Sequence, residues 1–144
     1  MLTYRELTAK HQREVNELPI MYAFSNKQFE DGMRNKLGLE PNETDKIYRL
    51  GSTGGFYKKT DAQLLKETFD RHSMELQEAM KNDEFVLEMF EYEMGNHEYQ
   101  ISYDKEDVIN ACGLDLDDMD ERLEQLWLKA KKHFLELCLK NNWF

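Results

Sequence analysis

The sequence contains few prolines, few cysteines and no long apolar run. Only 2 prolines and 2 cysteines occur among its 144 residues. No apolar run approaches the roughly 18 residues that a membrane-spanning helix needs. The amino-terminal residues also lack the apolar centre of a secretion signal. We therefore expect a helix-rich cytoplasmic protein that does not enter a membrane.

Both cysteines, Cys112 and Cys138, occupy apolar-patterned positions near the ends of predicted helices. Cysteine at such positions usually behaves as a small buried hydrophobic residue. Disulfides are rare in the reducing cytoplasm. The sequence therefore predicts two buried free thiols rather than a disulfide.

The usual sequence patterns of catalytic sites are missing. Neither H-E-x-x-H nor G-x-S-x-G occurs. A calcium-binding loop beginning at Asp115 would need an oxygen ligand, a glycine and a glutamate where the chain has Met119, Asp120 and Leu126. We therefore predict a non-enzymatic protein, with no catalytic residues, no metal site and no cofactor.

The glycine-rich stretch at 51–55 interrupts an otherwise helical pattern. Runs of β-branched and aromatic residues flank it at 46–50 and 56–59. This arrangement predicts a β-hairpin rather than a phosphate-binding loop, which would lead into a helix. If Leu50 faces Phe56, these two residues share an apolar face with Tyr48. The opposite face would then carry Arg49, Tyr57 and Lys59. The hairpin would be the centre on which the helices pack.

Apolar residues recur at three- and four-residue steps through most of the remaining chain, which is typical of amphipathic helices. Alternating aromatic and aliphatic residues at 97–103 predict a third strand beside the hairpin. The expected class is a single α+β domain over residues 1–144, mostly helical, with a three-stranded antiparallel sheet. The expected helices cover 3–18, 25–37, 60–80, 84–94, 104–112 and 117–140.

Negative charge is concentrated in one part of the chain. The net charge is −10, yet residues 82–124 hold 15 acidic and 2 basic residues and the rest is slightly positive. Such a field repels nucleic acid and attracts basic surfaces. The densest group opens the last predicted helix, where the helix dipole favours acidic side chains. The predicted partner-binding residues are Asp115, Asp117, Asp118, Asp120 and Glu121. The ordinary interpretation of the same residues is a solvated acidic helix start.

Two other functions remain open from the sequence. His97 follows Gly95 in an irregular segment, where functional residues often occur. His97, Glu93 and Glu98 could form the centre of a small metal-dependent enzyme. Glu93 and His97 would supply two metal ligands, but spacing fixes no third ligand. The basic hairpin residues could instead make the chain a nucleic-acid-binding accessory protein. Its net charge of −10 disfavours direct nucleic-acid binding. These hairpin residues are the basic Arg49, Lys58 and Lys59 together with the aromatic Tyr57.

Several short segments mark turns and helix ends, namely Phe24-Ser25 with Gln28-Phe29, Gly54-Gly55-Phe56, Asn96-His97-Glu98-Tyr99 and Cys112-Gly113-Leu114. Together these segments resemble a family of small acidic proteins from bacterial phages and mobile elements. Small acidic proteins of such elements include anti-CRISPR inhibitors, which often occupy a basic nucleic-acid channel. The resemblance thus implies an inhibitor that blocks a basic nucleic-acid-binding surface of a partner. That partner would be a basic protein such as a nucleic-acid-processing effector, and homo-oligomerisation is left open.

Overall fold

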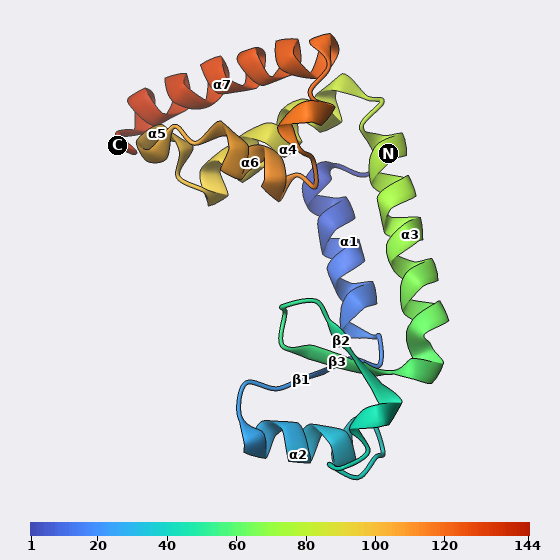
Figure 1. Cartoon of the computed structure of the whole chain (residues 1–144). Coiled ribbons are helices and arrows are strands. Elements are labelled where there is room, and N and C mark those ends of the chain that lie inside the picture. Colours follow the sequence, from blue (N-terminus) through green and yellow to red (C-terminus); the bar gives the residue numbers. More distant parts are fainter. The chain divides into compact units, whose positions relative to one another are not determined.

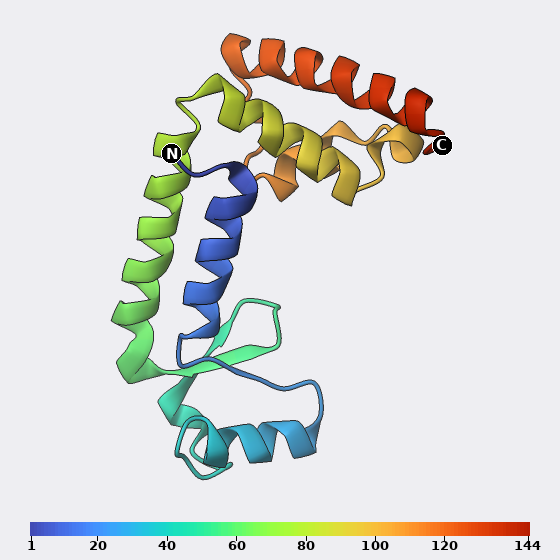
Figure 2. The same ribbon diagram turned by 180° about the vertical axis from the view of Figure 1, so that it is seen from behind.

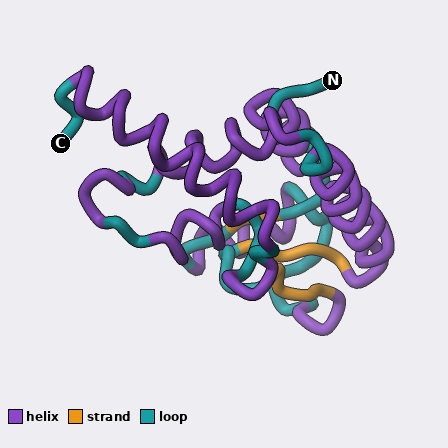
Figure 3. Tube along the Cα trace, turned by 90° about the horizontal axis from the view of Figure 1, so that it is seen from above, coloured by secondary structure: helices purple, strands orange, loops and turns teal.

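The computed structural model describes every residue from 1 to 144. It contains seven α-helices, three 3₁₀ helices and three β-strands. Helices dominate in both views of the ribbon (Figure 1 and Figure 2) and in the purple segments of Figure 3, which confirms the predicted mostly helical α+β class. The α-helices are α1 (Tyr4–Asn16), α2 (Asn26–Asn35), α3 (Ala62–Ala79), α4 (Asp83–Asn96), α5 (Tyr99–Ser102), α6 (Lys105–Ala111) and α7 (Glu121–Asn141). The strands are β1 (Met21–Tyr22), β2 (Ile47–Leu50) and β3 (Gly55–Lys58), and the 3₁₀ helices are η1 (Thr44–Lys46), η2 (Lys59–Asp61) and η3 (Leu116–Asp118).

The chain divides into two compact units. Residues 9–75 form one, which we call the sheet unit, and residues 1–8 with 76–144 form the other, the helical unit. The boundaries fall inside α1 and α3. The expectation of a single domain stays a prediction. None of the helices combines the length and the apolar composition needed to cross a bilayer.

The sheet has the order β1-β3-β2, and both pairings are antiparallel. The hairpin of β2 and β3 is confirmed, but the third strand is β1 and not 97–103. Residues Tyr99–Ser102 form the short helix α5 instead, between Glu98 and Tyr103, which both have positive φ. The alternating pattern there misled because only Tyr99 is buried, against Trp127, whereas Ile101 is 63% exposed.

The hairpin register differs from the prediction by one residue. Leu50 pairs with Gly55, and Phe56 pairs with Arg49. Phe56 therefore lies on the face opposite to Leu50 and Tyr57, since cross-strand partners share a face. Glycine at position 51 and at position 54 takes positive φ, so the turn extends to Gly54 and pairing resumes at Gly55.

Both faces of the sheet carry apolar residues, and a different set of helices covers each face. On one face, Phe56 packs edge to face on Phe29 of α2, with ring centroids 5.2 Å apart. Gly32 allows α2 to approach the sheet closely, because a Cβ there would collide with Met21. On the other face, Leu50 and Tyr57 pack in a cluster on α1 and α3 residues, including Val15, Leu65 and Phe69.

A polar cluster joins α1 and α3 within the sheet unit. The rings of His11 and His72 stack with centroids 3.9 Å apart. His11 bonds Glu75 at 2.8 Å, and His72 bonds Glu14 at 2.7 Å. Arg71 donates to both carboxylates, at 2.8 Å to Glu75. The two acids are thus neutralised by a shared cation and fix the pairing of the helices.

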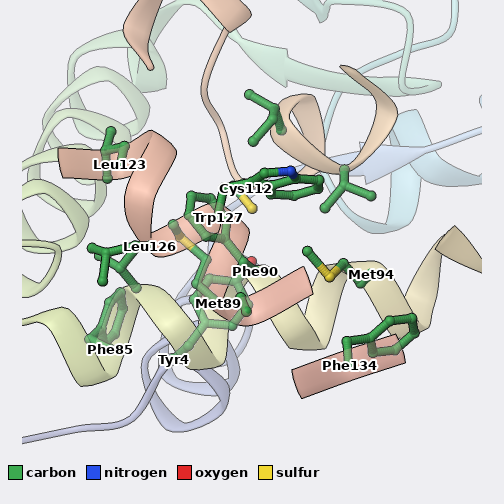
Figure 4. Close-up of a cluster of buried hydrophobic side chains, with 14 of the residues drawn as sticks. Tyr4, Phe85, Met89, Phe90, Met94, Cys112, Leu123, Leu126, Trp127 and Phe134 are labelled. Atoms are coloured by element: carbon green, nitrogen blue, oxygen red, sulfur yellow. The ribbon is translucent and has the colours of Figure 1, made fainter. Parts of the chain in front are cut away.

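The helical unit contains the largest core. Phe90 of α4 is fully buried and meets Trp127 of α7 edge to face at 5.4 Å between centroids. Figure 4 shows these rings beside Tyr4, Met89 and Cys112. No residue of the hairpin belongs to this cluster. The expectation that the hairpin is the centre of the whole chain is therefore wrong, because the hairpin organises the sheet unit alone.

Candidate partner-binding surface

Most of the acidic segment lies before α7 and is not part of that helix. The expected start at Asp117 is too early, because Leu116–Asp118 form the 3₁₀ helix η3 and α7 begins at Glu121. The side chain of Asp118 accepts a 2.8 Å hydrogen bond from the N–H of Asp115. Asp120 is the N-cap of α7, and its carboxylate accepts from the N–H of Leu123 at 2.8 Å. These local side-chain to backbone hydrogen bonds therefore determine that α7 begins at Glu121.

All five predicted partner-binding residues are exposed. No Lys, Arg or His of the chain lies within ion-pair distance of any of them. The carboxylates of Asp118 and Asp120 accept bonds from local backbone N–H groups, whereas the side chains of Asp117 and Glu121 accept none. Met119, between them, packs against the core of the helical unit and holds the segment in place. The segment therefore presents free carboxylates on a fixed backbone.

The whole net charge of the molecule resides in the helical unit. This unit has 18 acidic and 8 basic residues, so its charge is −10, whereas the sheet unit has 11 of each. Only three of the 18 acidic residues form an ion pair with Lys or Arg, namely Glu78, Asp83 and Glu124. Most of the negative charge is therefore available to a cationic partner.

An apolar groove of about 660 Å³ lies between α4 and the second half of α7, within the helical unit. Carboxylates line its α4 side, and Glu91 forms an ion pair with His133 of α7. Glu88 accepts from the N–H groups of Tyr4 and Arg5, at 3.1 and 3.4 Å, and so holds the start of α1. The third carboxylate, Glu84, forms no ion pair. The apolar lining residues are Leu87, Tyr92, Phe134, Leu137 and Trp143.

Sequence reasoning missed this groove. One signal was present, since Leu87 lies outside the inward stripe formed by the buried residues of α4. A single apolar residue off the buried stripe of a helix is common, so Leu87 marks a second contact surface only together with the other apolar residues of the groove. The contribution of Trp143, which is 53% exposed, depends on how the chain turns after α7 and could not be read from spacing.

The residues grouped around His97 are not assembled into a metal site. His97 Nδ1 bonds Asp107 at 2.9 Å, and Glu93 turns into the core, where it accepts from Asn96 Nδ2 at 2.8 Å. Glu98 is exposed and itself takes a left-handed backbone conformation, with a φ of +48°. No group of three His, Cys, Asp or Glu side chains in the chain is arranged to hold a metal ion.

Buried Glu93 instead affects its neighbours in the core. Burial raises the pKa of the Tyr4 hydroxyl well above its usual value, and the Glu93 carboxylate raises it further. Burial and the same carboxylate raise the pKa of the Cys112 thiol to about 12. Both groups therefore stay protonated and neutral at physiological pH. Cys112 and Cys138 are free and buried, as predicted.

The basic residues of the hairpin do not share one face. Arg49 lies beside Phe56, with its guanidinium 5.8 Å from the ring centroid. Lys59 lies over Tyr48 at 5.1 Å, and Tyr48 pairs with Tyr57 on the opposite face of the sheet. The predicted face with Arg49, Tyr57 and Lys59 together is wrong, because the observed register separates Arg49 from the other two. A continuous basic track for a nucleic-acid backbone is therefore not formed by the hairpin.

These observations define the class of protein, a mostly helical α+β protein whose helical unit presents free carboxylates. The chain belongs to the family of unknown function DUF7659, whose model matches residues 3–133. Comparisons with curated proteins and with solved structures gave no match. The family description carries no link to phages or to anti-CRISPR inhibitors, so that resemblance stays a prediction.

Proposed function

We propose that this protein is a non-enzymatic binding protein whose helical unit docks on a basic partner protein. The observation that carries the proposal is the group of five exposed carboxylates without a cationic partner, in a unit that holds the entire charge of −10. Carboxylates on a fixed backbone can occupy Arg and Lys side chains that otherwise hold phosphate groups. A nucleic-acid-processing effector is the class of partner that fits this mechanism.

Charge alone would give weak binding. An exposed ion pair is worth about 0–1 kcal/mol, so tight association needs several pairs together with a buried apolar anchor. The groove between α4 and α7 offers such an anchor, since it has an aromatic and aliphatic lining with carboxylates beside it. Trp143 and Leu137 are the residues there that a partner's apolar side chain would cover.

Inhibition of a defence effector, as in anti-CRISPR proteins, is the specific form of this proposal that the phage-family resemblance favours. A cytoplasmic location belongs to the same proposal, because both cysteines are unpaired thiols. In this form the protein would compete with DNA or RNA for the partner's basic channel. Excess nucleic acid should then release the partner.

The test is affinity capture from a lysate of the source organism, followed by measurement of the dissociation constant of the captured partner at several NaCl concentrations. The variant reverses Asp117, Asp118 and Glu121 to Lys. Losing three carboxylates and gaining three cations should weaken binding by about tenfold or more at low salt and flatten its salt dependence.

A matched control reverses three exposed acids of the sheet unit, Glu17, Glu30 and Asp31, none of which forms an ion pair. This control changes the net charge of the molecule by the same amount. It should bind the partner as the wild type does. The proposal fails if the two triple variants weaken binding equally, or if the first binds as tightly as the wild type with an unchanged salt slope.

A further inference from the structure

A second concave site lies wholly within the sheet unit, where the chain leaves β1 and enters α2. It is a cleft of about 500 Å³, with a smaller hollow of about 330 Å³ next to it beside the hairpin turn. Ala23, Arg49 and Phe56 line both parts. Phe29 and Ile47 form apolar walls of the larger part. Nothing in the proposed docking of the helical unit uses this cleft.

Arg49 is the cation of this cleft, and the chain leaves it without a counter-ion. No Asp or Glu side chain lies within ion-pair distance of its guanidinium, although the sheet unit contains 11 acidic residues. The guanidinium lies 5.8 Å from the centroid of the Phe56 ring, which restrains its position. Arginine is the side chain best suited to bind carboxylate and phosphate groups.

Phe24 supplies an aromatic surface in the same cleft. Its side chain is 77% exposed, which is unusual for phenylalanine. One part of its ring rests against Gly54, whose φ of +81° suits glycine and where a Cβ would collide with the ring. The rest of the ring is open. An aromatic ring supported on backbone and open to solvent is a surface on which a flat ligand can stack.

The backbone that carries Phe24 is fixed from both sides. The Ala23 N–H donates to the Gly54 carbonyl at 3.0 Å, and the Phe24 N–H donates to Gln28 Oε1 at 2.8 Å. The first bond ties the segment to the hairpin turn, and the second ties it to α2. The aromatic surface and the hairpin that bears Arg49 are therefore held in one arrangement before any ligand arrives, which lowers the entropic cost of binding.

We propose that this cleft binds a small ligand made of a flat aromatic ring that carries an anionic group, as in a mononucleotide or an aromatic carboxylate. The ring stacks on Phe24, and the anionic group binds Arg49. The apolar walls at Phe29 and Ile47 exclude water from the contact. Because the sheet unit is neutral overall, it does not repel a ligand with one or two negative charges.

The opposite face of the same sheet provides a matched control pair. There Lys59 lies over the exposed ring of Tyr48 at 5.1 Å, so a cation and an aromatic ring are again neighbours. Neither residue lines the cleft. If a cation beside an aromatic ring were sufficient for binding, this pair would bind the same ligands as the cleft.

The test is titration of the full chain with AMP, benzoate, adenosine and inorganic phosphate, followed by NMR chemical shifts of the backbone amides. We expect saturable binding of AMP or benzoate with shifts at residues 23–26 and 49–56. Adenosine and phosphate alone should bind about tenfold more weakly, since each makes only one of the two contacts. The relative affinity of AMP and benzoate distinguishes a phosphate ligand from a carboxylate ligand.

The variants Arg49→Gln and Phe24→Ala should each reduce affinity about tenfold, whereas Lys59→Gln and Tyr48→Ala should leave it unchanged. Both cleft residues are exposed, so folding should persist, which circular dichroism and urea unfolding verify. The proposal is overturned if neither AMP nor benzoate binds below about 5 mM, if adenosine binds as tightly as AMP and benzoate, or if the control variants lose as much affinity as the cleft variants.

Discussion

At the scale of single residues, the polar cluster of α1 and α3 shows how charge contributes to the fold. Glu14 is only partly exposed and is bonded by Arg71 and His72. The hydrogen bond from Arg71, followed by that from His72, lowers the pKa of Glu14 from 4.5 to about 2. The pKa of Glu75 is also lowered, chiefly by its hydrogen bond with His11. The ionised forms of both carboxylates are therefore favoured in the folded state.

A lowered pKa in the folded state gives stability that is complete above the unfolded pKa and is lost as the pH falls through the folded pKa. For Glu14 this window extends from 4.5 down to about 2. We therefore expect the urea midpoints of wild type and Glu14→Gln to differ at about pH 6 and to converge as the pH falls to about 2. Glu17→Gln, at an exposed site without an ion pair, is the control and should follow the wild type throughout. A constant difference between wild type and Glu14→Gln would contradict this origin of the acid sensitivity.

Phe90 is the largest of the completely buried side chains. Phe90→Ala removes its edge-to-face contact with Trp127 and leaves a cavity in the core, so it should lower the free energy of unfolding by about 3–5 kcal/mol. Urea unfolding followed by tryptophan fluorescence measures the change. Leu139→Ala, at a position that is 72% exposed, should change it by less than about 0.5 kcal/mol. Equal effects at the two positions would show that the packing of α4 on α7 is loose.

At the scale of elements, the start of α7 separates two roles among the predicted binding residues. Asp120 caps the helix through its bond to the Leu123 N–H, whereas Asp117 has no partner. Asp120→Ala should therefore destabilise the protein by about 1 kcal/mol and Asp117→Ala by close to zero. Thermal unfolding of the two variants measures the difference. If both changes cost the same, Asp120 contributes to stability through charge rather than through its cap.

Local signals predicted many of the elements. Ser25 and Asp104 cap α2 and α6 as expected, and both hairpin strands begin and end within one residue of their predicted limits. The third strand could not be predicted, because β1 has only two residues and forms through its pairing with β3. Alternation at 97–103 gave a false strand, since aromatic residues can alternate in a short helix whose outer side is exposed. Whether each of these two segments forms a strand depends on pairing with residues that are distant in sequence.

The exposure of the acidic residues was also predictable, because five carboxylates near one another cannot be buried without cations. The groove and the cleft were not. The groove combines α4 and the second half of α7 with Trp143, which lies beyond the end of α7. The cleft depends on the pairing that places Arg49 beside Phe56. A register shift of one residue moves a side chain to the other face of a sheet. The sequence alone therefore placed Arg49 on the wrong face.

At the scale of the whole molecule, the helical unit carries the net negative charge and the sheet unit is neutral. The carboxylates of the helical unit repel one another, and salt screens this repulsion. Raising NaCl from about 10 to about 150 mM should therefore raise the urea midpoint reported by Trp127 and Trp143, which both lie in this unit. The triple reversal of Asp117, Asp118 and Glu121 should reduce the effect. An equal salt response in both proteins would show that the local charge density is unimportant for stability.

The buried thiols of the helical unit also record how often its core opens. With the pKa of Cys112 raised to about 12, the thiol is almost entirely protonated at neutral pH, and its burial bars a reagent from reaching it. An alkylating reagent can therefore modify Cys112 or Cys138 only in molecules whose core has opened. The rate at which iodoacetamide consumes these two thiols becomes a measure of the opening frequency, obtained from the natural sequence without any added label.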